Sequence, residues 1–346
     1  MSIWQKNTIE DKKALIQFTA DKENINQVAV EKDWWVTVVL KTLFQTSCAE
    51  SLLFKGGTSL SKGWDSIIER FSEDIDLAID HSFFNVNETS KSQKEKLRKQ
   101  ARKYVHETLS KELGEQLDAM GIVGYSIENI TTIQTANGEK AIDSDKDPTV
   151  IHLNYESILD SKVEYIPSRV KIEISCLSMA EPCELKEITS LIYSHYPEED
   201  DDTRSNIKTV LPTRTFLEKI FLLHEEFQKD TPRHLRMSRH LYDLERLMDT
   251  NFGKEALSDT HLYAEIVKHR SLYYTLKYID YQKHHPSTIN FCPPEKNRKD
   301  WDRDYEEMKN SFIYADNKLS FDELIARIEE LQSRFRQLEI RQNFLE

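Results

Sequence analysis

Apolar side chains recur at helical spacing through the first segment of the chain. Within residues 8–46 they fall three, four or seven positions apart, a pattern typical of an amphipathic helix. This segment contains the run EKDWW at residues 31–35. We expect Trp35 to pack the helix against a sheet and Trp34 to flank that contact, while the charged side chains of the run meet water.

The clearest strand pattern lies at residues 74–80, where acidic or small side chains alternate with isoleucine or leucine. Successive side chains of a strand point to opposite faces, so the apolar set is expected to face a core. Asp74 and Asp76 then lie side by side on the other face, roughly 6–7 Å apart. Just before them, residues 56–59 (GGTS) predict a turn of small residues, and residues 60–69 predict a short helix.

A long charged helix and further strands are predicted next. Residues 89–120 carry a narrow apolar stripe among many lysines and arginines, whose basic face is expected to be mostly solvated and could also approach a nucleic-acid backbone. Alternation around Glu173 places this carboxylate on the polar face of an otherwise buried strand. The strand predictions cover residues 124–134, 149–157, 167–179 and 182–193.

The acidic run at residues 198–202 marks the predicted domain boundary. Like charges repel one another, so residues 197–208 are expected to form an exposed loop or linker. Helical patterns follow, opening with a possible capping box of Thr215 and Glu218. We predict a mixed α/β domain and a C-terminal helical domain, which cover residues 1–208 and 209–346.

Composition narrows the class of protein. The chain has 346 residues, a length that is enough for two domains. Apolar residues make up 38% and charged residues 31%, as expected for a globular protein with a polar surface. No apolar run approaches the length of a membrane span, and four cysteines without Cys-x-x-Cys spacing favour a reduced, cytoplasmic protein. The net charge of −13 argues against broad, non-specific nucleic-acid binding but allows a local basic patch.

The paired carboxylates suggest a metal site. Asp74 and Asp76 repel each other unless a cation lies between them, and Mg²⁺ commonly uses one or two carboxylates together with substrate phosphates. The small-residue turn at 56–59 can bring backbone N–H groups against those phosphates. The alternatives are a solvent-facing acidic strand or a structural calcium site, although no EF-hand pattern is present.

At this point a family resemblance becomes visible. The runs GGTSLSK and RFSEDIDL resemble the signature of the AbiEii/AbiGii toxin family, which includes the MenT toxins, within the polymerase-β-like nucleotidyltransferase superfamily. The runs EKDWW, RTFLEKIFLLHE and RHLYDLERL are similar to further segments of that family. The resemblance extends from residue 31 to 247 and implies a mixed α/β nucleotidyltransferase domain, with the nucleotide bound between it and the helical domain.

The resemblance also implies roles for particular residues. Asp74, Asp76 and Glu173 would hold Mg²⁺, as two ions, with Mn²⁺ as a possible substitute. Lys219 and Asp243 would face the metal site from the helical domain, with Lys219 neutralising phosphate charge. Contacts to the nucleoside triphosphate are expected from Gly56, Gly57, Thr58, Ser59, Lys62, Ser72 and Lys219.

Without the resemblance, plainer interpretations hold for three of these residues. Glu173 could belong to an exposed strand edge, as a partner of a neighbouring lysine. Lys219 and Asp243 could be ordinary helix charges. The spacing would then allow two i, i+4 ion pairs on these helices, Arg214–Glu218 and Arg239–Asp243.

The implied reaction is transfer of a nucleoside monophosphate from a nucleoside triphosphate to an acceptor hydroxyl. The implied acceptor is the 3′ end of tRNA, which the arginines at 233, 236 and 239 could contact. The implied outcome is growth arrest under control of a cognate antitoxin, as in abortive infection and phage defence. Nucleotidylation of a protein or small molecule stays open. A non-catalytic nucleotide-binding interaction protein is the alternative from another class.

Overall fold

The structure is a computed structural model that describes residues 3–86, 90–135, 138–160, 166–179, 182–274 and 276–339. Its chain divides into two compact units. Unit 1 comprises Met1–Gly63 and Ser72–Thr209, and unit 2 comprises Trp64–Phe71 and Val210–Glu346. The division near residue 209 lies beside the expected boundary, but the assignment of residues 64–71 to unit 2 was not anticipated.

The segment at residues 8–46, which was expected to be helical, consists of two helices, and a shorter helix precedes it. Thr8 caps the first of the two in a capping box with Asp11, and Asn24 ends it in the left-handed conformation. Asn26 then caps the next helix, so polar residues at 24–26 divide one apolar pattern into two elements. These elements are α1 (Ile3–Lys6), α2 (Ile9–Glu23) and α3 (Gln27–Leu43).

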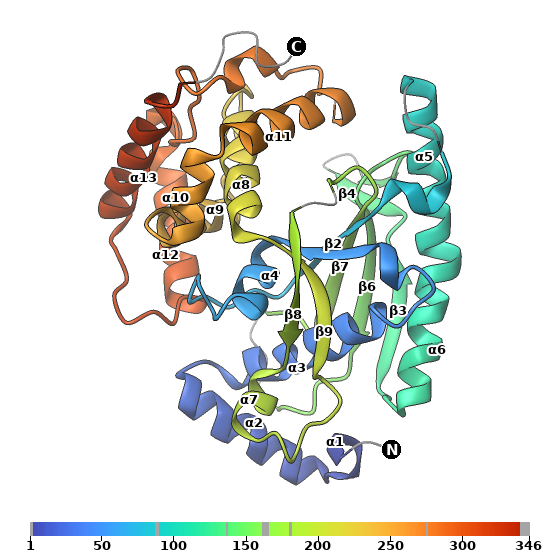
Figure 1. The fold of residues 1–346 in the computed structure, drawn as a ribbon. Helices are drawn as coiled ribbons and strands as arrows, with labels where there is room; N and C mark the ends of the chain where they lie inside the picture. Colours follow the sequence, from blue (N-terminus) through green and yellow to red (C-terminus); the bar gives the residue numbers. More distant parts are fainter. Residues whose placement is uncertain are drawn as a thin grey trace. The chain divides into compact units, whose positions relative to one another are not determined.

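A mixed seven-stranded sheet forms the centre of unit 1, in the order β3-β6-β7-β2-β1-β9-β8 (Figure 1). Strand β2 pairs in parallel with β7 and antiparallel with β1, so the mixed α/β fold is confirmed. A separate hairpin consists of β4 (Thr132–Thr135) and β5 (Gly138–Ala141). The sheet strands are β1 (Leu52–Lys55), β2 (Ile75–Ile79), β3 (Tyr125–Asn129), β6 (Thr149–Tyr155), β7 (Arg169–Ser175), β8 (Cys183–Ile188) and β9 (Ser205–Val210).

The two faces of the sheet differ in polarity as the alternation predicts. The buried face carries the isoleucines of β2 and β7, including Ile75 and Ile172, which are register partners. Trp35 of α3 stacks on Tyr155 of this face, with ring centroids 5.0 Å apart, so α3 packs against the sheet as expected. Trp34 stacks on Trp4 of α1 at 4.9 Å.

The long helix predicted over residues 89–120 is continuous but carries a local irregularity. It consists of α5 (Lys91–Tyr104), one π-helical stretch η3 (Val105–Leu109) and α6 (Ser110–Met120). Ser90 caps α5 in a capping box, and the predicted first residue, Thr89, lies outside the described residues. The apolar stripe from Leu97 to Leu117 is buried, so this pattern identified the packed face correctly.

The expectation of an exposed loop or linker at residues 197–208 was wrong in part, because only some of its acidic residues, such as Glu198 and Asp201, are exposed. Asp200 and Asp202 are buried, and Ser205–Val210 forms β9, which pairs in parallel with β1. The Asp200 carboxylate accepts hydrogen bonds from the hydroxyls of Ser190 at 2.5 Å and Thr203 at 2.8 Å. Burial raises the pKa of Asp200. Hydrogen bonds from these two nearby hydroxyls therefore offset the cost of burying the Asp200 carboxylate, which the argument from like-charge repulsion left out.

The segment after β8 also contains the short helix α7 (Leu191–His195).

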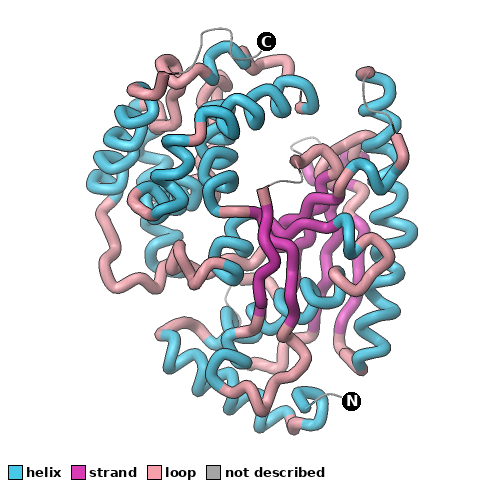
Figure 2. The backbone as a smooth tube through the Cα atoms, viewed as in Figure 1, coloured by secondary structure: helices cyan, strands magenta, loops and turns pink. Residues whose placement is uncertain are grey.

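Unit 2 is built from helices joined by loops, apart from the one bridge given below, in the segments that the structure describes (Figure 2). Helix α8 begins at Pro212, so Thr215 lies inside the helix and the expected capping box with Glu218 was wrong. The apolar stripe of the last helix is buried from Leu324 to Phe335, as its spacing predicted. The helices are α8 (Pro212–Glu226), α9 (Ser238–Met248), α10 (Asn251–Ser258), α11 (Thr260–Tyr273), α12 (Arg298–Ser311) and α13 (Phe321–Arg336), with short 3₁₀ turns at Tyr281–His284 and Glu295–Asn297.

The segment Trp64–Phe71 packs within unit 2. Trp64 meets Phe252 edge to face, with ring centroids 5.2 Å apart, and Arg70 forms an antiparallel bridge with Ile313. The chain thus leaves unit 1 after residue 63 and returns to it at Ser72. No helix within the described ranges combines the length and hydropathy that crossing a membrane requires.

Candidate active site

The GGTS run begins a helix and is not a separate turn. Helix α4 (Gly56–Gly63) starts directly after β1 ends at Lys55, which corrects the expected helix over residues 60–69. Gly56 has a φ of +83°, and a Cβ added there would lie 2.2 Å from Oδ2 of Asp76. Only glycine adopts this conformation readily and lets the backbone approach the carboxylate so closely. The start of α4 and Asp76 therefore form one local structure.

The hydroxyls of this run serve internal contacts. Thr58 is 1% exposed and donates a hydrogen bond of 2.5 Å to the backbone carbonyl of Asp74, beside the hydroxyl of Ser72 at 2.9 Å. The Ser59 hydroxyl donates to the carbonyl of Gly56 at 2.9 Å. Thr58 and Ser72 thus position the residue that precedes β2. Any contact of Thr58 or Ser59 with phosphate would come from the backbone N–H groups of the first helical turn.

The register of the sheet brings Asp76 and Glu173 together. They are direct partners in the parallel pair of β2 and β7, so their side chains lie on the same face of neighbouring strands. Lys55 of β1 is the partner of Asp76 on its other side. Asp74 lies just before β2, which begins at Ile75, and both aspartates are partly buried. One row therefore presents a lysine and two carboxylates.

Glu173 already has a cationic neighbour. Its carboxylate lies 2.8 Å from Nζ of Lys171, and β7 lies between β2 and β6, so the alternative of an exposed strand edge was wrong. On the neighbouring strand β6, His152 is the register partner of Lys171. Burial lowers the pKa of His152, while the Asp74 carboxylate acts to raise it. Among the described residues, no three or more His, Cys, Asp and Glu side chains form a group arranged to hold a metal ion.

The charged residues of the EKDWW run are buried, so the expectation that they meet water was wrong. Lys32 is 2% exposed and donates to Glu73 at 2.7 Å and to the carbonyl of Pro167 at 3.1 Å. Asp33 lies 2.5 Å from Nζ of Lys62. Lys32 therefore holds the residue next to Asp74, and Asp33 holds the last turn of α4. Lys62, expected to contact the nucleotide, lies in this buried ion pair.

The first residue of the run makes a separate contact. The Glu31 carboxylate accepts hydrogen bonds from the Ser157 hydroxyl at 2.6 Å and from the Ile158 N–H at 2.8 Å. Burial raises the pKa of Glu31, and these two donors oppose the rise. Three consecutive charges on α3 thus each bind a different segment of unit 1: Glu31 binds the segment after β6, Lys32 binds Glu73, and Asp33 binds α4. Sequence reasoning missed them because helix periodicity cannot show that opposite charges from distant segments compensate buried charge.

Unit 2 contains a buried cluster around Asp243, which is 0% exposed. The Arg70 guanidinium donates to both carboxylate oxygens, at 2.6 and 2.8 Å, and Nζ of Lys219 lies 2.9 Å from Oδ2. Lys219 is 6% exposed, so its interpretation as a solvated helix charge was wrong. The expected Arg214–Glu218 pair does form, at 2.9 Å. Asp243 thus holds two cations in a fixed arrangement.

The pKa values of this cluster follow from burial and charge. Burial acts to raise the pKa of Asp243, but Arg70 and Lys219 outweigh it and lower the pKa well below its usual value. Burial lowers the pKa of Lys219, against the attraction of Asp243. Arg70 comes from the same motif stretch as Asp74 and Asp76, but its side chain belongs to this cluster. Its role was not predicted, because no periodicity relates residue 70 to residue 243.

The positions of the predicted residues can now be compared. Unit 1 brings together Gly56, Asp74, Asp76 and Glu173 around the start of α4, while unit 2 brings together Lys219 and Asp243. The residues that sequence reasoning missed are Lys55, Arg70, Glu73 and His152. Lys171 was expected beside Glu173, because both share one parity of the same strand, whereas Lys55 meets Asp76 only through the pairing of β1 with β2.

Comparison with known proteins places this geometry in a family. The sequence model of the family described as "Nucleotidyl transferase AbiEii toxin, Type IV TA system" matches residues 38–327, which extends the resemblance well beyond residue 247. No curated protein matches the chain.

Solved structures that are similar to this one include the following two. MenT4, a nucleotidyltransferase toxin from Mycobacterium tuberculosis, has a TM-score of 0.52 at 17% identity, covering 96% of this chain and 91% of its own. JHP933 from Helicobacter pylori has a TM-score of 0.41 at 13% identity, covering 90% of this chain and 94% of its own. The likeness to MenT4 supports the fold. Because the family match spans most of the sequence, the chain belongs to the AbiEii toxin family of type IV toxin–antitoxin systems and is a nucleotidyltransferase.

Proposed function

We propose that this toxin transfers a nucleoside monophosphate from a nucleoside triphosphate to a hydroxyl at the 3′ end of an RNA, with tRNA as the first candidate, in a metal-dependent reaction. The observation that carries this proposal is the approach of the Gly56 backbone to the Asp76 carboxylate, at a distance that no side chain could occupy. It joins a helix start, suited to phosphate, with a carboxylate, suited to a metal ion. A cognate antitoxin would counteract the resulting growth arrest.

The donor atoms have the chemistry that a hard divalent cation requires, although the described side chains do not form a ready-made group of three ligands. Asp74, Asp76 and Glu173 supply carboxylate oxygens, the ligands that Mg²⁺ and Mn²⁺ prefer, and substrate phosphates would complete the coordination. When bound, such ions stabilise the attacking and leaving oxygens of the displacement. To bind the metal ion, Glu173 would give up its ion pair with Lys171. Gly56 and Gly57 would direct backbone N–H groups to the triphosphate, while Thr58, Ser59, Lys62 and Ser72 support the nucleotide site.

The remaining two predicted residues act through charge. Lys219 would neutralise negative charge that builds on the β- and γ-phosphates as pyrophosphate leaves. The observation that supports this role of Lys219 is its ion pair with Asp243. The pair fixes the ammonium group, so little reorganisation would be needed during the reaction. Asp243 is then a positioning residue, because it acts through Lys219 and Arg70.

The most direct test is incubation of the purified protein with each labelled nucleoside triphosphate, Mg²⁺ and total cellular RNA. Label in RNA that is removed by a 3′ exonuclease supports the proposal, and omission of the metal should abolish it. Label in protein or in a small molecule would replace RNA as the acceptor. Nucleotide binding without any transfer would contradict the proposed reaction and favour a non-catalytic binding protein.

Substitution of Gly56 by alanine should disturb the site in a specific way. The new Cβ would meet the Asp76 carboxylate at 2.2 Å, and alanine at a φ of +83° also costs roughly 1–2 kcal/mol. We expect a loss of melting temperature together with a loss of turnover of at least tenfold, because Asp76 must move. Both quantities should be measured on the same sample.

Gly121→Ala provides the matched control for this substitution. Gly121 has a φ of +78°, but an added Cβ there meets nothing within 4 Å. It should therefore lose a similar amount of stability through backbone strain and keep its turnover. If Gly56→Ala were no less active than Gly121→Ala, the close contact with Asp76 would have no part in the reaction.

An RNA acceptor needs a local basic surface on this acidic protein. The arginines at 233, 236 and 239 were the first candidate, but Arg233 donates to Glu226 at 2.7 Å, which reduces its capacity for phosphate. The exposed lysines of α5 are the stronger candidate because they are more numerous, although Lys99 is itself paired with Glu95 at 2.6 Å. They share their helix with several further basic residues and one acidic one, Glu95. The exposed members are Lys91, Lys96, Lys99 and Lys103.

Replacement of Lys96, Lys99 and Lys103 by alanine should weaken RNA binding and its dependence on salt. Each lost phosphate contact lowers the salt slope by roughly 0.7 for a single strand, so the triple variant should lose about 2. The control is a triple variant of the exposed residues Lys6, Lys254 and Lys299, which changes the net charge equally. Equal salt slopes for the two triple variants would assign the RNA contact to another surface.

A further inference from the structure

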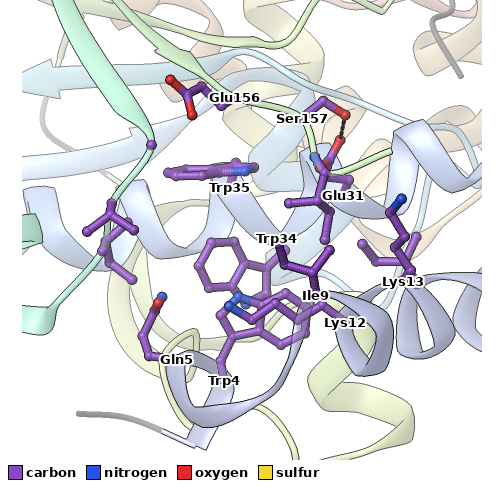
Figure 3. Close-up of a pocket in the computed structure, with 15 residues that line it drawn as sticks. Trp4, Gln5, Ile9, Lys12, Lys13, Glu31, Trp34, Trp35, Glu156 and Ser157 are labelled. Atoms are coloured by element: carbon purple, nitrogen blue, oxygen red, sulfur yellow. Dashed lines mark hydrogen bonds between the residues drawn. The ribbon is translucent and has the colours of Figure 1, made fainter. Parts of the chain in front are cut away.

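Unit 1 contains a cavity of about 540 Å³ beside α3, outside the proposed nucleotide site. Its walls include three of the five tryptophans of the chain, Trp4, Trp34 and Trp35. In Figure 3 the indole of Trp35 lies between Glu156 and Trp34, and the hydrogen bond from Ser157 to Glu31 lies to one side. This volume lies within the range of about 300–1,000 Å³ that is typical of small-molecule sites.

The aromatic walls are arranged at an angle. Trp34 and Trp35 meet edge to face, with centroids 5.3 Å apart and an interplanar angle of 87°, whereas Trp4 stacks on Trp34. Trp4 covers one face of Trp34 and Tyr155 covers one face of Trp35, so a planar ring that enters this corner can stack only on the remaining face of one indole while it presents its edge to the other. An aliphatic chain would gain only the burial of its surface. The walls therefore favour a flat aromatic ligand.

The polar groups of the cavity add a second requirement. Glu31 is 4% exposed, and each of its carboxylate oxygens accepts one protein hydrogen bond and can accept another. Two lysines and two glutamates line the cavity, so their formal charges cancel. Lys13 is paired with Asp160 at 3.0 Å, and Nζ of Lys12 lies 5.4 Å from the centroid of the Trp4 ring. This environment suits a neutral ligand that donates a hydrogen bond to Glu31.

The cavity is separate from the carboxylates of the proposed active site. Trp35 stacks on Tyr155, and this residue shares its face of β6 with Ile151 and Leu153. In the paired strands, Glu173 and Asp76 point to the opposite face of the sheet. A ligand here would therefore not occupy the nucleotide site. It would contact Glu31 of α3. The two residues that follow Glu31 in this helix, Lys32 and Asp33, form the ion pairs with Glu73 and Lys62.

From these observations we propose that the tryptophan-lined cavity is a second ligand site of this toxin, which binds a neutral, planar heterocycle whose N–H group donates to the Glu31 carboxylate. The proposal goes beyond the nucleotidyl transfer reaction and does not depend on it, because binding can be measured without nucleotide, metal or RNA.

Two isomeric probes test both parts of the ligand class. 3-Methylindole keeps its N–H group, whereas 1-methylindole has the same size but no donor. Calorimetry on the full chain should give a Kd of roughly 0.1–1 mM for 3-methylindole, as expected for a ligand of this size. Binding of 1-methylindole should be about tenfold weaker, since a hydrogen bond to a charged group is lost. No binding of 3-methylindole, or equal affinity for both isomers, would overturn the proposal.

Variants locate the binding to this cavity. Val123 lines it and is 75% exposed, so Val123→Phe should fill the cavity without disturbing the core and weaken 3-methylindole binding at least tenfold. Ile9→Phe, at a second exposed lining position, should act in the same direction. Leu185→Phe is the control, because Leu185 is 66% exposed on β8 and does not line the cavity. Unchanged affinity in both filled variants, with melting temperatures like that of the control, would refute the assignment.

Discussion

Asp76→Ala is expected to abolish nucleotidyl transfer while the protein stays folded. Asp76 lies beside Glu173 on the neighbouring strand and against the backbone of Gly56, so it is central to the proposed metal and phosphate site. Its removal takes away a metal ligand, and we expect turnover to fall by a factor on the order of 10³. Stability should not suffer, because the substitution also relieves repulsion between two neighbouring carboxylates. Label incorporation and thermal melting on one sample measure the two effects.

Asp80→Ala is the matched control for this experiment. Asp80 has the same parity and follows β2 directly, but its carboxylate accepts from the Ser82 N–H and caps a short 3₁₀ turn. Its loss should cost about 1 kcal/mol of stability as a lost cap and leave turnover close to normal. Near-normal turnover in folded Asp76→Ala, or an equal loss in both variants, would contradict the role of Asp76 as a metal ligand.

Asp243→Ala should produce the largest loss of stability in unit 2. The substitution leaves the charges of Arg70 and Lys219 buried without their shared carboxylate, and breaking such a buried pair typically costs about 3–5 kcal/mol. The free energy of unfolding is best measured in denaturant. Lys219→Met should cost less, because the bidentate pair of Arg70 and Asp243 persists.

Asp249→Ala is the control for the number of charged partners. Asp249 also binds two arginines, Arg327 and Arg334, but its side chain is 53% exposed. Water screens such contacts, so the variant should lose about 1 kcal/mol or less. A similar loss in Asp243→Ala and Asp249→Ala would show that burial does not determine the strength of the Asp243 cluster.

The dependence on pH gives an independent measurement of the same cluster. The folded protein lowers the pKa of Asp243 below its value in the unfolded chain, which is about 4. The contribution of Asp243 to stability is therefore complete above that unfolded value and is lost as the pH falls toward the lowered, folded one. Asp243→Ala should show a shallower loss of stability over this acidic range than the wild-type protein. Parallel curves would contradict the ion-pair assignment.

Much of the fold could be predicted because it depends on periodicity. The alternation in β2 and β7 identified which residues face the core, and the stripes of α6 and α13 identified packed faces. The mixed α/β fold and the toxin family were also predicted from residues 54–80, whose motif is local in sequence. The acidic and glycine residues of that motif needed only one strand and one helix start to become neighbours.

The failures concern buried charges whose partners a sequence pattern does not indicate. Lys32 and Glu73 compensate each other across 41 positions, and the Asp200 carboxylate is compensated by the Ser190 hydroxyl ten positions before it. A single sequence shows each charge alone, and an isolated charge is normally placed in water. The same limit applies to Arg70, because it adjoins the metal motif in sequence but is paired with a residue 173 positions away.

The path of residues 64–71 limits how this protein can be divided or recombined. A fragment that begins at residue 210 would contain Asp243 and Lys219 but not Arg70, and a fragment that ends at residue 209 would contain Arg70 without its carboxylate. The helical half is therefore not a portable module that a single gene fusion could transfer to another catalytic domain. An exchange of this half would have to preserve both junctions around residues 64–71.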